Sequence, residues 1–527
     1  MNKKKVNFEN VHWADNFAQK AIDSFPNYKE YIVESGVTPS GIIHVGHFRE
    51  MITMEMIRRA FEKKGKKSRF LYSWDSYDAF RKVPKNIPEK WNKYLRLPLN
   101  KVPDPFGCHG SFAEHFMKEG EDALNVFNFP IEYQYQHKLQ TSGIYADGIK
   151  TILQAEQKNQ IQEILNRYRQ EPLKENWTSA TIFCEKCSKD TTKILNYNNE
   201  YEIEYRCDCG YENKIDFRKT PIVKLLFRTD WPMRWAYYGV TVEGGGKDYA
   251  TPGSPWFSGN IILNEIFKKP KLIGPFHNFV RMKGSGGKIS SSKGDGATTK
   301  DLLEIYSKEL VLYLFTGTRP NAEFDISFDL DVIKIYEDYD KLERLYYDLE
   351  KEKNPKMLAN KKRIYELSMP GGVEIQKQIP FQPSFRHLSV VAQANDFDYK
   401  KVEKYYLKDL KTNFDKKRLK ERFSCVKNWL EKYAPEEMRF SIQNEIKINL
   451  DENEKKLLIE LRSILKTAKE ESELIVEFKE LSKRYNLELK EFFKLIYMTI
   501  IGKEKGPKLS GLLFENKEKV LLLLKTI

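Results

Sequence analysis

The sequence has no continuous apolar segment long enough to cross a bilayer, and the short run "VLLLL" at 520–524 falls far below that length. No apolar stretch follows the basic cluster at 3–5, as one would in a secretory leader. We therefore expect a cytoplasmic protein with no membrane partner.

Cysteine is also scarce, with six residues in a chain of 527, so a disulfide scaffold is excluded. A Walker phosphate loop is absent, because Gly287-Lys288 is followed by Ile289 rather than by Ser or Thr. No internal repeat is evident. The chemistry must therefore come from motifs of another kind.

What the chain does contain is a globular composition with an excess of positive charge. It is 40% apolar and 31% charged, and its length predicts three or four domains. The net charge of +14 favours a polyanionic partner such as nucleic acid. A general bias toward lysine is the alternative explanation.

The first part of the chain predicts a β-α-β unit. Residues 30–37 and 68–75 are short and rich in β-formers, and residues 44–67 between them carry apolar residues at helical spacing. His44 and His47 fall in the first turn of the predicted helix.

These two histidines lie on one helical face and permit two uses. As a metal pair they would lack the third ligand and the nearby glutamate that zinc enzymes usually supply. A helix N-terminus, in contrast, offers free N–H groups and a positive dipole end to phosphate, and the imidazoles add donors. Gly46 between them would let a flat base approach the backbone. Phosphate binding is the favoured interpretation.

A second stretch, "GSGGKISSSKGD" at 284–295, places Lys288 and Lys293 around three serines in a glycine-rich context. It has two interpretations. It is either an exposed loop with solvated lysines or a closing loop that brings them to a phosphate group.

In this order, the two stretches resemble the paired signatures of class I aminoacyl-tRNA synthetases. His44-Val45-Gly46-His47 matches the "HIGH" signature with one conservative change, and "KISSS" at 288–292 occupies the place of "KMSKS". Ser291 stands where the second lysine is usual, so the lysine that reaches the phosphates is either Lys288 or Lys293.

Further blocks narrow the resemblance to the class I lysyl-tRNA synthetases, the type typical of archaea and some bacteria. These blocks are "RKVP" at 81–84, "VPDPFGCHGSFAEHF" at 102–116, "DWPMRWAYYGV" at 230–240, "GKDYA" at 246–250, "ISSSKG" at 289–294 and "YEDYDKLERLYY" at 336–347.

The resemblance implies an α/β fold, in which a Rossmann-type nucleotide-binding catalytic domain is split by a small zinc-ribbon-like insertion and followed by an all-α C-terminal domain. We predict the first catalytic half, with an acceptor-end insertion, at 1–182 and the zinc-ribbon-like insertion at 183–217. The second half, with the KMSKS-like loop, is predicted at 218–325. The helical stem-contact and anticodon-binding region is predicted at 326–527.

The resemblance also implies the reaction and its partners. The carboxylate of L-lysine would attack the α-phosphate of ATP, which carries Mg²⁺, and the lysyl group would then pass to the terminal ribose of tRNA(Lys). We expect a monomer. The implied catalytic residues are His44, His47, Lys288 and Lys293, and the implied ATP contacts are Pro39, Ser40, His44, Gly46, His47, Lys288, Ser290, Ser292 and Lys293.

The amino-acid pocket implied by the resemblance departs from the family pattern at three positions. Phe227, Tyr249 and Phe276 stand where Trp, His and Tyr are usual, whereas Gly36 and Thr38 match. Either the pocket has drifted and still selects lysine, or its selectivity has changed or activation has been lost, because polar contacts dominate discrimination of a polar substrate.

Four of the six cysteines form a C-x2-C and a C-x-C pair on either side of a predicted hairpin. Thiolates at this spacing are typical of a closed structural zinc site, and four unliganded thiols are the alternative. The cysteines are Cys184, Cys187, Cys207 and Cys209.

Cys108, His109 and His115 form a looser set. They could bind a metal, but we favour a role at the acceptor end of tRNA or in side-chain packing.

The chain becomes almost wholly helical after about Asp325, with lysine interleaved by tyrosine and phenylalanine. Such helices suit an RNA backbone and unstacked bases. Two other functions stay open, namely a related ligase with changed specificity and a non-catalytic tRNA-binding paralogue. The presence of both signature motifs argues against the paralogue.

Overall fold

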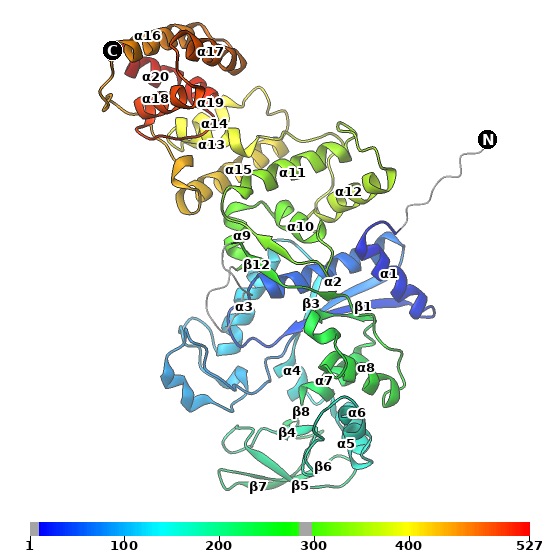
Figure 1. The fold of residues 1–527 in the computed structure, drawn as a ribbon. Helices are drawn as coiled ribbons and strands as arrows, with labels where there is room; N and C mark the ends of the chain where they lie inside the picture. The colour runs from blue at the N-terminus through cyan, green and yellow to red at the C-terminus, as the bar shows by residue number, and fades with distance from the viewer. Residues whose placement is uncertain (1–9, 284–297) are drawn as a thin grey trace, which may run out of the picture. The chain divides into compact units, whose positions relative to one another are not determined.

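The computed structural model describes residues 10–283 and 298–527, which fall into two compact units (Figure 1). The first unit contains the chain up to residue 302 together with 311–326 and 351–375. The second contains 303–310, 327–350 and 376–527. The predicted site residues Lys288, Ser290, Ser292 and Lys293 lie outside the described residues.

A four-stranded parallel sheet of order β3-β2-β1-β9 forms the centre of the first unit. Its strands are β1 (Glu30–Val37), β2 (Lys67–Trp74), β3 (Ile131–Tyr135) and β9 (Val242–Glu243). Helix α2 (Val45–Lys63) connects β1 to β2, and α1 (Trp13–Ser24) packs against α2. The β-α-β unit predicted from the sequence is confirmed, with boundaries that differ by a few residues at most.

Helix α2 is buried on most of its surface, because the sheet and several loops of the first unit surround it. Arg49 in α2 donates hydrogen bonds of 2.7–3.2 Å to the backbone carbonyls of Asn278, Phe279, Arg319, Pro320 and Ala322. A buried guanidinium needs such acceptors, because it stays protonated and charged at neutral pH. Arg49 thereby fixes the segment around residue 279 against α2.

The other elements of the first unit surround this sheet. Two short parallel pairs join β10 (Gly245–Gly246) to β11 (Phe276–His277) and β12 (Val280–Met282) to β13 (Phe324–Ile326). The helices are η1 (Glu89–Tyr94), η2 (Leu99–Lys101), α3 (Phe112–Asn125), α4 (Gln136–Thr141), α7 (Phe227–Tyr238), η3 (Lys247–Ala250), α8 (Pro255–Glu265) and α12 (Pro355–Leu367).

A small antiparallel sheet of order β5-β6-β7 carries the paired cysteines. Its strands are β5 (Thr192–Tyr197), β6 (Glu202–Cys207) and β7 (Glu212–Asp216), and the antiparallel pair β4 (Ala180–Ile182) and β8 (Val223–Leu225) lies before and after it in sequence. Side chains of this sheet share a hydrophobic core with α5 (Ala146–Gln157) and α6 (Gln160–Asn166).

Every regular element within the described part of the second unit is helical. Its helices are α11 (Asp331–Tyr346), α13 (Phe385–Ala394), α14 (Tyr399–Tyr405), α15 (Asn413–Lys432), η5 (Glu436–Met438), α16 (Glu452–Thr467), α17 (Glu471–Arg484), α18 (Leu489–Ile501), α19 (Leu509–Glu515), α20 (Lys517–Leu523) and η6 (Leu524–Thr526). Helices α9 (Thr299–Ile305) and α10 (Lys308–Thr316) contribute residues to both units.

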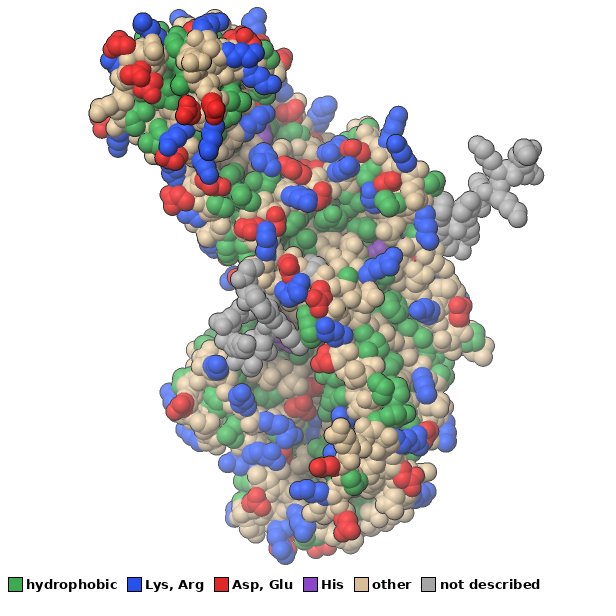
Figure 2. Space-filling model, viewed as in Figure 1, with side chains coloured by type: hydrophobic (Ala, Val, Ile, Leu, Met, Phe, Trp, Pro, Cys, Tyr) green, Lys and Arg blue, Asp and Glu red, His purple; other side chains and the backbone are tan. Residues whose placement is uncertain are grey.

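In the part of the chain that the structure describes, no helix combines the length and the apolar character needed to traverse a bilayer. Figure 2 shows lysine and arginine side chains spread over the visible face of the molecule, interspersed with aspartate and glutamate.

Candidate active site

The N-terminus of α2 opens at the carboxyl ends of β1 and β2, and the two histidines fix its first turn. The N-cap residue is His44, whose Nδ1 accepts the Gly46 N–H at 3.0 Å. His47 Nδ1 accepts the His44 N–H at 3.3 Å, and the two rings stack with centroids 4.0 Å apart. The pair therefore forms a reciprocal cap in which imidazoles replace the usual hydroxyl and carboxylate.

This cap decides which nitrogen of each histidine carries the proton. A neutral imidazole that accepts a hydrogen bond at Nδ1 holds its proton on Nε2. His44 and His47 consequently present Nε2–H donors, which suit phosphate oxygens and not a metal ion. The phosphate interpretation of the motif agrees with this geometry.

Gly46 meets a local steric requirement as well. A Cβ at this position would lie 2.8 Å from His44 Cε1, closer than van der Waals contact permits. The glycine is thus needed by the cap itself, in addition to any approach of a base that the sequence predicts.

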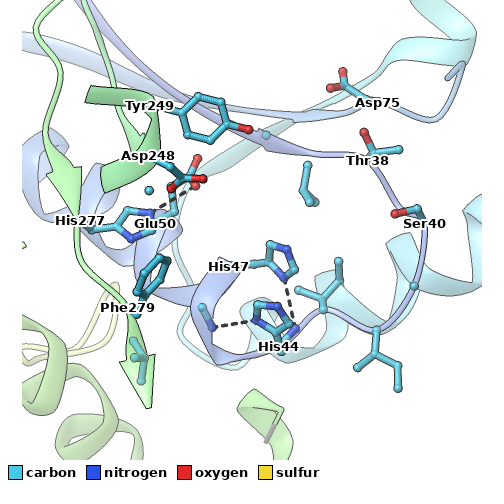
Figure 3. Close-up of a pocket in the computed structure, with 18 of the residues that line it drawn as sticks. Thr38, Ser40, His44, His47, Glu50, Asp75, Asp248, Tyr249, His277 and Phe279 are labelled. Carbon is cyan, nitrogen blue, oxygen red and sulfur yellow. Dashed lines mark hydrogen bonds and ion pairs between the residues drawn. The ribbon is translucent and has the colours of Figure 1, made fainter. Parts of the chain in front are cut away.

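A cavity of about 450 Å³ lies in front of this helix end (Figure 3). Of the sequence-predicted residues it brings together Gly36, Thr38, Ser40, His44, Gly46, His47, Phe227 and Tyr249. The cavity therefore unites most of the predicted site residues that the structure describes.

Phe276 and Pro39 are not among the residues that line the cavity. The Phe276 ring packs edge-on against Trp256 with centroids 4.8 Å apart, and its neighbour His277 lines the cavity instead. Side chains alternate along β11, so the sequence position next to the expected one supplies the lining side chain.

Three acidic residues that the sequence analysis did not single out also line the cavity, namely Glu50, Asp75 and Asp248. The described lining contains no lysine or arginine. Glu50 lies three residues after His47 on α2, and Asp75 directly follows β2. Helical spacing could therefore have indicated that Glu50 lies at the site, and the position at the carboxyl end of a parallel strand could have indicated the same for Asp75.

A buried charge network lies behind Asp75. Arg234 Nη1 is 2.9 Å from Asp75 Oδ1 and its Nε is 3.1 Å from Asp230, while Lys224 Nζ is 2.6 Å from Asp230 and 3.6 Å from Asp78. Burial by itself lowers the pKa of Lys224, but the carboxylates of Asp230 and Asp78 outweigh burial and raise it. Both cations consequently stay charged, and Arg234 holds Asp75 at the cavity wall.

Aromatic side chains form a further wall. The Phe227 ring stacks on Trp231 at 4.8 Å, and Trp231 meets Tyr249 edge-on at 5.7 Å. The buried carboxyl group of Glu243 accepts the indole N–H of Trp231 at 2.7 Å and that of Trp235, which fixes α7 against β9. An aliphatic chain would find an apolar surface here.

The four paired cysteines converge in the small β-sheet insertion. Their Sγ atoms lie within 4.8 Å of one another, with Cys184 and Cys209 at 3.8 Å and Cys187 and Cys207 at 3.6 Å. A tetrahedral ion with Zn–S bonds of about 2.3 Å places its sulfurs about 3.8 Å apart. The donor set therefore fits zinc.

A second cluster joins Cys108, His109 and His115 to Asp104, which the sequence analysis missed. Cys108 Sγ lies 3.1 Å from His109 Nδ1 and 3.3 Å from His115 Nδ1, and Asp104 Oδ1 lies 3.4 Å from the latter atom. These side chains are closer together in space than their spacing in the sequence indicated. Their nitrogen, sulfur and oxygen donors could hold a metal.

A helix N-terminus with two imidazoles at the carboxyl edge of a parallel sheet, next to a cavity with acidic and aromatic walls, is typical of nucleotide-binding α/β enzymes. Residues 11–371 match the sequence model of the family described as tRNA synthetases class I (K), and the chain belongs to that family. The resemblance seen in the sequence is confirmed at this level.

Sequence similarity to several lysine–tRNA ligases extends over nearly the whole chain. A lysine–tRNA ligase of Borreliella burgdorferi is 44% identical over 508 residues, which cover 95% of this chain and 96% of that protein. Lysine–tRNA ligases of Pyrococcus furiosus and Treponema pallidum are 38% and 37% identical over 95% of this chain, covering 97% and 96% of those proteins.

Proposed function

We propose that this protein is a lysine–tRNA ligase, which activates L-lysine with ATP to lysyl-adenylate and transfers the lysyl group to the 3′-terminal ribose of tRNA(Lys). The observation that carries the proposal is the cavity in front of α2, whose described lining has three acidic residues and no lysine or arginine. Such a lining attracts a substrate with ammonium groups and repels acidic amino acids.

The residues at the start of α2 act on the nucleotide. The Nε2–H groups of His44 and His47 and the positive end of the helix dipole stabilise the triphosphate as charge develops in the transition state. The lysine carboxylate is already ionised at neutral pH, so the protein positions it for in-line attack on the α-phosphate and needs no general base. Mg²⁺ bound with ATP neutralises phosphate charge.

Lys288 or Lys293, with Ser290 and Ser292, stabilises the leaving pyrophosphate, as the family resemblance implies; these residues lie outside the described part of the chain. The helical region from 326 onward binds the stem and the anticodon of the tRNA. The sequence alone predicts these two roles, the bounds of the four domain segments, the monomeric state and the cytoplasmic location.

Cys184, Cys187, Cys207 and Cys209 hold a structural Zn²⁺ ion, which makes residues 183–217 a zinc-ribbon-like insertion. The four sulfurs lie within 4.8 Å of one another, and four protein ligands would leave no open position for catalysis. The ion therefore stabilises the small sheet and takes no part in the reaction.

ATP–pyrophosphate exchange over all standard amino acids, with and without tRNA, tests the function. We expect exchange with lysine alone. Exchange with a different amino acid would mean that Phe227 and Tyr249 have changed the selectivity of the pocket. Absence of exchange under both conditions, with ATP still bound, would instead favour a tRNA-binding paralogue.

A further inference from the structure

The acidic residues of the cavity lie on two different walls. In Figure 3, Asp75 lies beside Thr38, whereas Glu50 and Asp248 lie together across the cavity, next to Tyr249 and His277. A lysine substrate has two ammonium groups, and only the one at the end of its side chain distinguishes it from other amino acids. Which wall receives this ε-ammonium group therefore decides the selectivity.

Asp75 already has a fixed cationic partner, Arg234, which it shares with Asp230. Its Oδ1 lies 2.9 Å from the guanidinium of Arg234, which is itself buried. An ammonium group brought to this wall would have to share the carboxylate with Arg234 and would meet its like charge.

Glu50 has a different environment. Its Oε1 accepts a hydrogen bond from the Ser35 hydroxyl at 2.9 Å, and its Oε2 lies 3.4 Å from His277 Nε2. A hydroxyl brings no charge, and an imidazole is cationic only when protonated. Among the described residues, no lysine or arginine forms an ion pair with Glu50, so its carboxylate is oriented but not neutralised by a permanent cation.

The position of Glu50 fits the length of the substrate. It lies one helical turn after His47 on the same face of α2, so a side chain can extend from the phosphate-binding end of the helix toward it. Tyr249 lies beside Glu50 and Asp248, where its ring can contact the end of the substrate chain (Figure 3). The Glu50 side chain is only 20% exposed, and an ion pair in such a partly desolvated place is stronger than on an open surface.

We propose that Glu50, with Asp248 beside it, binds the ε-ammonium group of lysine and is the residue that determines the amino-acid selectivity. The inference rests on the proposed function and assigns the part of the cavity that selects the substrate. Ser35 and His277 are positioning residues, because they hold the two carboxylate oxygens.

The test compares lysine with L-2-aminoheptanoate, in which a methyl group replaces the ε-ammonium, in ATP–pyrophosphate exchange with tRNA present. For Glu50→Gln we expect kcat/KM for lysine to fall about 100-fold, mainly through KM, and kcat/KM for the methyl analogue to stay within a few-fold. Glu50→Asp keeps the charge and should recover part of the loss. The matched control Asp75→Asn should leave the ratio of the two substrates within a few-fold of the wild-type ratio.

Equal losses for both substrates in Glu50→Gln, with ATP affinity and thermal unfolding unchanged, would overturn the inference, since selectivity would then lie elsewhere. A collapse of the substrate ratio in Asp75→Asn but not in Glu50→Gln would overturn it as well. These outcomes require a wild-type protein that activates lysine. A wild-type protein without lysine-dependent exchange would instead contradict the proposed function itself.

Discussion

At the scale of single residues, the reciprocal cap of His44 and His47 is the feature with the clearest chemical consequence. Each Nδ1 accepts a backbone N–H, so each Nε2 is a donor that can contact phosphate. The same two side chains start the helix and, in the proposed function, contact the nucleotide, so the two roles can be separated by substitution.

His47→Asn keeps an acceptor near the place of Nδ1 but removes the Nε2–H donor. We expect kcat for ATP–pyrophosphate exchange to fall about 100-fold, as for other donors that stabilise transition-state charge, with the midpoint of thermal unfolding nearly unchanged. His47→Ala loses the cap as well and should also cost about 1 kcal/mol of stability. Equal activity of the wild type and His47→Asn would contradict the assigned role.

At the scale of elements, the neighbouring strands β1 and β9 place two buried carboxyl groups side by side, because Glu34 pairs in register with Glu243. Burial raises the pKa of Glu34 to about 7, although Arg234 and the hydroxyl of Ser73 partly oppose the shift. The pKa of Glu243 is raised as well, with burial as the main cause.

The raised pKa of Glu34 predicts how stability depends on pH. Above its ordinary pKa near 4.5, an unfolded glutamate is ionised while the folded protein retains the proton, so the free energy of unfolding falls as pH rises to about 7. The full loss is about 3 kcal/mol. Glu34→Gln should remove this loss. The unfolding midpoint of the variant, compared with that of the wild type, should therefore rise between pH 5 and pH 8. Parallel pH profiles would contradict this.

The small sheet β5-β6-β7 carries the four sulfurs of the proposed zinc site and shares its hydrophobic core with α5 and α6. Cys207→Ser should lower the zinc content of the purified protein by one equivalent per chain and lower the unfolding midpoint of the insertion. Cys425→Ser is the matched control, because Cys425 is buried in α15 and should leave the zinc content unchanged. Equal zinc content in the two variants would exclude the site.

At the scale of the whole molecule, the net charge of +14 is spread over a mixed surface (Figure 2). The proposed binding of tRNA must release condensed counterions, whereas lysine, with two cationic groups and one anionic group, releases few.

We therefore expect the affinity for tRNA to fall at least 100-fold between 50 and 200 mM salt, with a linear dependence of log Kd on log salt concentration. The affinity for lysine should change only slightly over the same range. Filter binding for tRNA and calorimetry for lysine measure the two slopes. A tRNA affinity independent of salt would contradict a phosphate-dominated interface.

The sequence by itself determined the β-α-β unit, the helical region after about residue 325, the two synthetase signatures and the paired cysteines. These features are local: the hydrophobic period sets strands and helices, and short spacings along the chain set the motifs. Family membership followed from the same local patterns.

Only the tertiary structure decided what lies around the cavity. Glu50 and Asp75 belong to the predicted β-α-β unit, but Asp248 comes from a remote segment, and no local pattern shows that the three face one space with no described lysine or arginine in its lining. The structure also shows that His277, and not Phe276, lines the cavity. Which side chain of β11 faces the cavity depends on the pairing of this strand with β10. Sequence patterns identify the elements and their motifs, but the packing of remote segments sets which side chains meet and what charge surrounds the substrate.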